Sequence, residues 1–93
     1  MKTDSAVYHC TLGELLAAKG SMKEAFQTFE TGASELLILE ARPALAMAYQ
    51  SFGRLLKKLK NGNSSKSLEY LTKAADLYRE MELPEEALKC TDE

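Results

Sequence analysis

The sequence LGELLAAKGSMKEAFQTFETG (residues 12–32) predicts two helices that fold back on each other. Gly20 and Ser21 mark the turn, because glycine often follows the last residue of a helix and serine often precedes the first. Gly13 lies in the middle of the first helix, where alanine would be about 1 kcal/mol more favourable. We therefore expect Gly13 where the two helices approach closely, with Ala25 and Phe29 of the second helix facing Leu12 and Leu16 of the first.

The rest of the chain predicts further helices, because its apolar residues recur at helical spacing and do not alternate. Thr3–Ser5 offer side chains that would cap the first helix, and Ser21 with Glu24 has the pattern of a capping box. Pro43 suits the first turn of a new helix. We expect a first hairpin over residues 4–40, a second over 43–81 with a loop at 61–65, and a terminal helix over 84–91.

Each predicted helix has an apolar side that we expect to face the core. In the second helix this side is Ala25, Phe26, Phe29, Ala33, Leu36 and Leu37; in the third it is Leu45, Ala48, Tyr49, Phe52, Leu55, Leu56 and Leu59; in the fourth it is Leu68, Leu71, Ala74, Ala75 and Tyr78. After the fourth helix, Leu83, Leu88 and Cys90 are expected to be exposed.

Length and charge restrict the class of protein. Residues 1–93 suffice for a single small domain. The net charge of −2 argues against nucleic acid and acidic membranes as partners, because both require a strongly positive surface. The sequence has no apolar run that could span a bilayer and no signal-peptide pattern at its start. Two cysteines are expected as reduced, packed thiols, so we expect a cytoplasmic protein.

An internal repeat connects the two hairpins. Leu12-Gly13 and Phe52-Gly53 lie forty residues apart, and a leucine follows each glycine three residues later. In this respect the chain resembles the tetratricopeptide repeat family, whose unit is a helix-turn-helix hairpin. The first unit resembles it at His9, Leu12, Gly13, Leu16, Gly20, Ala25, Phe29 and Gly32, and the second at Tyr49, Phe52, Gly53, Leu56, Ser67, Leu71 and Ala74. The forty-residue spacing resembles members of the family with longer helices.

The resemblance implies an all-α fold of antiparallel hairpins stacked as a short solenoid. The terminal helix then resembles the opening of a third unit, which favours a fragment of a longer array over a short helical cap. A rival architecture is a three-helix bundle like the microtubule-interacting and trafficking domain. It would leave the match between the two hairpins unexplained.

We find no residues arranged for catalysis. His9 is the only histidine, and the residues three and four positions later on its helix, Leu12 and Gly13, offer it no polar partner. Cys10 beside it points about 100° away around the helix, so the two do not form a nucleophile–base pair. No cysteine or histidine spacing fits a metal site. We therefore expect a protein that is not an enzyme and that uses no cofactor.

Partner binding is what the resemblance implies, with the first helix of each unit lining a concave groove that holds an extended peptide or a partner helix. Mapped by register, the groove residues are Val7, Cys10, Glu14 and Ala17 from the first helix and Met47, Gln50, Arg54 and Lys57 from the third. Arg54 and Lys57 would either contact an acidic partner or form a solvated helix end. The second hypothesis is self-association, as a homodimer through the terminal helix or by stacking on further repeats.

Overall fold

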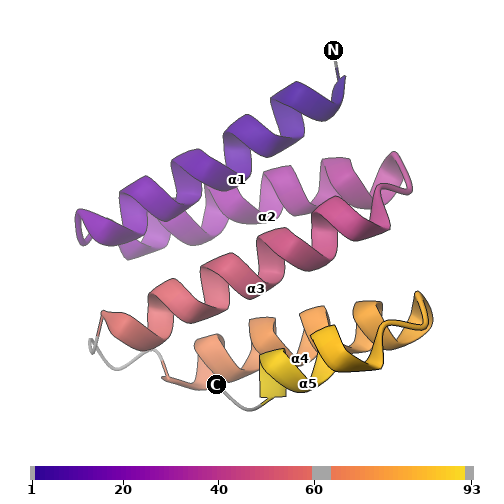
Figure 1. Cartoon of the computed structure of the whole chain (residues 1–93). Coiled ribbons are helices and arrows are strands. Elements are labelled where there is room, and N and C mark those ends of the chain that lie inside the picture. Colours follow the sequence, from indigo (N-terminus) through magenta and orange to yellow (C-terminus); the bar gives the residue numbers. More distant parts are fainter. Residues whose placement is uncertain (1, 60–63, 92–93) are drawn as a thin grey trace.

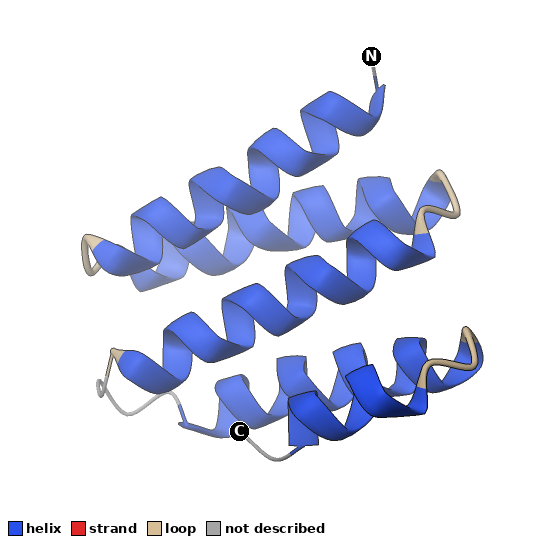
Figure 2. Ribbon diagram, viewed as in Figure 1, coloured by secondary structure: helices blue, strands red, loops and turns tan. Residues whose placement is uncertain are grey.

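The structure is a computed structural model that describes residues 2–59 and 64–91. These residues form five α-helices and no strand, as expected for an all-α fold (Figure 2). The predicted loop at 61–65 lies mostly outside the described residues. The helices are α1 (Lys2–Ala18), α2 (Met22–Ile38), α3 (Arg42–Lys58), α4 (Ser64–Glu80) and α5 (Pro84–Thr91).

The helices form two antiparallel hairpins, α1–α2 and α3–α4, and α5 packs against α4 (Figure 1). The hairpins lie side by side, because α3 contacts both α1 and α2. The described residues therefore make a flat body two helices thick, measuring 35 × 34 × 13 Å between Cα atoms. In this stack α1 lies at one edge and α4 with α5 at the other, which leaves the side-by-side helices α1 and α3 on one face (Figure 1).

Three of the turns share one geometry, in which a single residue with positive φ ends the helix. This residue is Gly20 (φ 92°), Glu40 (φ 57°) or Glu82 (φ 61°). Its amide donates to the carbonyl three residues earlier, and the next amide donates to the carbonyl five residues earlier, over 2.8–3.0 Å. This is the Schellman motif, which satisfies the last carbonyls of a helix. The sequence predicted it at Gly20 and did not predict it at the two glutamates.

Replacing Glu40 or Glu82 with glycine is expected to stabilise the protein by about 1 kcal/mol each. Glycine has no Cβ to strain the left-handed conformation, and the change removes a negative charge near a helix C-terminus. Urea denaturation followed by circular dichroism would measure the gain. The alanine variants at the same positions lose the charge and keep the Cβ, so glycine variants no more stable than these would contradict the prediction.

The predicted side-chain caps of two helices are wrong. Ser21 is the N-cap of α2, but its side chain makes no capping hydrogen bond, and its ψ of 65° lies outside the extended region usual for a capping serine. The capping box fails because the Ser21 amide already donates to the Leu16 carbonyl at 2.9 Å, which leaves no N–H for Glu24. At the other end of this hairpin, α1 begins at Lys2, so Thr3–Ser5 lie inside the helix and do not precede it.

The core is an aromatic cluster where α2, α3 and α4 meet. Phe29 of α2 stacks on Phe52 of α3 with ring centroids 4.1 Å apart, and Tyr70 of α4 packs edge-on against both rings. All three are buried, and Phe26 and Tyr49 surround them. The Tyr70 hydroxyl donates to Glu30 at 2.6 Å, and burial together with this hydrogen bond raises its pKa. The cluster therefore joins the two hairpins.

Three expectations about burial are wrong. Leu37 and Leu68 are 63% and 67% exposed, whereas Cys90 is buried against Ala87 and Tyr78. The inward face of α4 includes Ser67, whose buried hydroxyl donates to the carbonyl of Gly53 at 2.7 Å, and Leu68 lies about 100° further around the helix. The expected exposure of Leu83 and Leu88 is confirmed.

Helices touch most closely at three glycines. A Cβ on Gly13 would lie 2.9 Å from the Phe29 Cβ, and a Cβ on Gly53 would lie 2.8 Å from Leu71 Cγ. The expected contacts at these two glycines are confirmed. Gly32 is a third contact, where a Cβ would lie 2.7 Å from the carbonyl oxygen of Ala6. Within each hairpin, the absence of a side chain at these glycines therefore lets the two helices pack closely.

Candidate partner-binding groove

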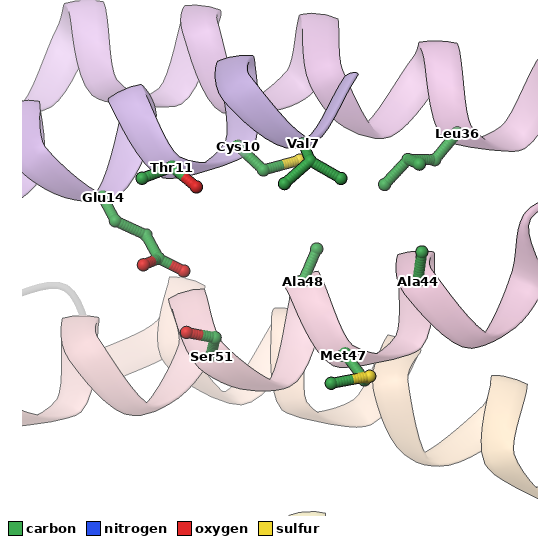
Figure 3. Close-up of a pocket in the computed structure, with 9 residues that line it drawn as sticks. All are labelled: Val7, Cys10, Thr11, Glu14, Leu36, Ala44, Met47, Ala48 and Ser51. Carbon is green, nitrogen blue, oxygen red and sulfur yellow. The ribbon is translucent and has the colours of Figure 1, made fainter. Parts of the chain in front are cut away.

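A groove runs between α1 and α3, on the face of the stack where these two helices lie side by side (Figure 3). Its first part is a hollow of about 340 Å³ with mostly apolar walls. Val7 and Cys10 of α1 face Ala44 and Ala48 of α3 across it, and Leu36 of α2 closes one end (Figure 3). Thr11, Glu14, Met47 and Ser51 complete the lining. A hollow with apolar walls and few polar groups suits a side chain of a partner.

A second hollow of about 390 Å³ continues the groove along α3. It is lined by Glu14, Met47, Gln50, Ser51, Arg54, Leu55 and Lys58, three of which also line the first hollow. The two hollows therefore form one groove that changes character along its length. The first part is apolar, the carboxylate of Glu14 lies where the two hollows join, and the far end has the cationic side chains of Arg54 and Lys58.

The structure places six of the eight predicted groove residues in this groove. Val7, Cys10, Glu14 and Met47 line the first hollow, and Gln50 and Arg54 line the second. Lys57 lines neither hollow, and Lys58 lies at the groove instead. The reason is the helical register, because Lys58 is four residues after Arg54 and thus on the same side of α3. Ala17, also expected here, is buried in the core.

Two of these residues form the floor of the groove, and others are open to a partner. Cys10 and Gln50 are buried, whereas Val7 and Met47 are 47% and 64% exposed. The Gln50 side-chain oxygen accepts a hydrogen bond from the Tyr78 hydroxyl at 3.1 Å. Its position is therefore fixed by the fold, and a partner would contact mainly the exposed side chains.

The Cys10 thiol stays protonated at neutral pH. Burial first, and the nearby carboxylates of Glu14 and Glu35 second, raise its pKa from 9.0 to about 11. A thiolate is the nucleophilic form, so this side chain is inert near pH 7 and behaves as a small apolar group. The floor of the first hollow is therefore uncharged.

His9 has a partner that the sequence did not reveal. Its Nδ1 lies 2.6 Å from a carboxylate oxygen of Glu35 on α2, and the Ser5 hydroxyl donates to the other oxygen of Glu35 at 3.4 Å. The expectation that His9 lacks a polar partner is therefore wrong, since it considered only the histidine's own helix. The carboxylate lies between the serine and the histidine, whereas a nucleophile requires the base beside it. This group consequently joins α1 to α2 and does not form a catalytic triad.

Residues 2–59 and 64–91 hold neither a metal site nor a membrane-spanning helix. No cluster of three or more histidine, cysteine or acidic side chains in these ranges could hold a metal ion. Among the helices described, none combines the length and apolar character needed to cross a bilayer. Comparison with protein-family models, with curated proteins and with solved structures finds no match to this chain.

Proposed function

We propose that this protein is a non-catalytic interaction module that binds a protein or peptide partner in the groove between α1 and α3. The observation that carries the proposal is the groove itself, an open channel with an apolar half and a charged half that two packed hairpins hold in place. The tetratricopeptide resemblance supports it, because that family binds extended peptides on the corresponding face. The thiols of Cys10 and Cys90, buried and without a disulfide, fit the cytoplasm as the compartment.

The chemistry of the groove favours a particular kind of segment. An apolar side chain would enter the hollow beside Val7 and Met47, where burying a leucine-sized group contributes about 1.5–3 kcal/mol. An acidic residue further along would lie near Arg54 and Lys58. Glu14 at the junction disfavours a second carboxylate there. We therefore propose a segment with an apolar anchor and an acidic residue on one side of it.

Selection from a displayed library of random peptides would test this function. The intact protein is the target, and the variant Met47→Glu serves for counter-selection, because Met47 is exposed and its replacement leaves the core unchanged. Enriched peptides are expected to share the apolar anchor and the acidic residue. Their affinity, measured by fluorescence polarisation, is expected to fall at least about 10-fold with Met47→Glu. Selection that enriches no peptide over this variant would contradict the proposal.

Charge reversal would test the second half of the groove. The double variant Arg54→Glu/Lys58→Glu is expected to weaken binding of an acidic peptide by about 10-fold or more. Lys57→Glu is the matched control, because Lys57 is an exposed lysine next in sequence to Lys58 and lies outside the groove lining. Equal effects of the two variants would show that the general charge of this helix end matters and that the groove does not select the acidic residue.

A further inference from the structure

The outer side of α1 carries apolar side chains that the described residues leave uncovered. Tyr8 and Leu15 are 62% and 55% exposed, and Leu12 and Leu16 beside them are half-buried. The opposite side of α1 has Ala6, Cys10, Gly13 and Ala17 against the core. The apolar residues of α1 therefore surround the helix, and such a helix normally has neighbours on both sides.

The internal repeat shows what kind of surface this is. Forty residues further along, Leu12 corresponds to Phe52 and Leu16 corresponds to Leu56. Phe52 and Leu56 are fully buried, because α3 lays this face against the preceding hairpin, where Phe52 stacks on Phe29. Leu15 corresponds in the same way to Leu55, which packs at the edge of the same core. The outer face of α1 is thus the counterpart of a helix–helix interface that the chain forms internally.

Within the chain, α3 stacks on α2. In a second copy, α4 is the counterpart of α2, but α5 already covers the face of α4 on which another hairpin would stack. Ala87 and Cys90 of α5 are buried against Ala75 and Tyr78 of α4. A second copy therefore cannot stack head to tail on α1 as α3 stacks on α2. What another copy can offer is its own α1, and two identical surfaces pair about a two-fold axis, which closes the assembly at two chains.

We infer that this chain forms a two-fold dimer through the outer face of α1, with the two α1 helices antiparallel. Tyr8, Leu12 and Leu15 lie at positions i, i+4 and i+7, which places them along one side of the helix. In an antiparallel pair centred near Leu12, Tyr8 of one copy meets Leu15 of the other. Glu35, at the end of this face near Ser5, then approaches the exposed Lys19 of the other copy, so the charges of the two ends are complementary.

The dimer differs from the self-association expected from the sequence, which placed the contact at the terminal helix. It is also independent of the proposed groove, because the groove uses Val7, Cys10 and Glu14 on another side of α1. A dimer of this kind presents two grooves, so a partner with two binding segments would bind with raised avidity. Loss of dimerisation would leave peptide binding at each groove unchanged, which separates the two proposals.

Sedimentation equilibrium of the intact protein, from about 1 µM to about 1 mM, tests the dimer. The wild type is expected to pass from monomer to dimer without larger species. Leu15→Glu is expected to weaken dimerisation about 100-fold, because each dimer would bury two unpaired carboxylates. Leu68→Glu, which changes another leucine that is more than half exposed, at the other edge, is the matched control and should dimerise as the wild type does. Circular dichroism verifies that both variants fold.

Three results would overturn the inference: a wild type that stays monomeric throughout, larger species that grow with concentration, or a dimer lost in Leu68→Glu and kept in Leu15→Glu. The last would instead place the contact at the edge formed by α4 and α5. Cysteine pairing tests the register. A tagged Tyr8→Cys chain mixed with a Leu15→Cys chain is expected to form a disulfide-linked pair, whereas Leu68→Cys mixed with Leu15→Cys is not. The native Cys10 and Cys90 are buried and do not compete.

Discussion

Replacing Phe29 with alanine is expected to remove about 3–5 kcal/mol from the free energy of unfolding, which is a large share of the total for a domain of this size. Phe29 is fully buried, stacks on Phe52 at 4.1 Å and contacts Tyr70 edge-on. Its ring fills the place where α2 meets both helices of the second hairpin. The variant therefore loses buried area and leaves a cavity that rigid helices cannot close. Urea denaturation followed by circular dichroism would measure the loss.

Phe26→Ala is the matched control for this prediction. Phe26 lies on the same helix and also contacts Phe52 and Tyr70, with ring centroids 5.9 and 6.4 Å away, but it is only partly buried. Its replacement is expected to cost about 1–2 kcal/mol, because less apolar area is removed and solvent fills the space. A control variant as unstable as Phe29→Ala would show that the two hairpins are not joined chiefly through Phe29.

Replacing Gly32 with alanine is expected to destabilise the protein by about 1–2 kcal/mol, although alanine is the better helix former. A Cβ at Gly32 would lie 2.7 Å from the Ala6 carbonyl oxygen and 2.9 Å from the Cys10 amide nitrogen. Both are backbone atoms of α1, so the two helices would have to move apart. Overpacking of this kind costs about 1–3 kcal/mol, which exceeds the gain of about 1 kcal/mol in helix propensity.

Gly53→Ala provides the comparison, because the two atoms nearest to the new methyl group there belong to a side chain. The nearest atoms are Leu71 Cγ at 2.8 Å and Leu71 Cδ2 at 3.0 Å, and the Leu71 backbone nitrogen follows at 3.2 Å; the two side-chain carbons can shift more readily than the backbone atoms that face Gly32. We expect this variant to lie within about 1 kcal/mol of the wild type, since the gain in propensity offsets the strain. Thermal unfolding of both variants measures the difference. A Gly53→Ala variant less stable than Gly32→Ala would contradict the ranking.

Much of the groove could be predicted from the sequence, because its residues follow from register. Once Gly13 and Gly53 are recognised as equivalent contacts, the sides of the first and third helices that face the groove are fixed, and six of the eight predicted residues lie there. The sequence predicted Cys10 as a packed thiol, but it could not show that Cys10 and Gln50 together form the buried floor of the groove. Their burial depends on how closely α2 and α4 approach behind them.

Helix number, helix ends and contact points were determined by local sequence. Apolar spacing of three and four residues, prolines at helix starts and a glycine at a turn act within a few residues of the chain, and they place all five helices to within a few residues. Mid-helix glycines likewise indicate that another helix approaches closely, but they do not show which helix it is. These features depend on local backbone sterics and on the spacing of apolar residues, both of which can be recognised in a short stretch of sequence.

The tertiary structure alone decided which side chains meet. Tyr70 became the centre of the core, Glu35 became the partner of His9, and Leu68 was left exposed, although the pattern of α4 alone marked that leucine as buried. Helix geometry fixes only the directions of a helix's side chains relative to one another. Which side of the helix faces the core depends on how helices distant in sequence pack, so these pairings exist only once the hairpins are stacked.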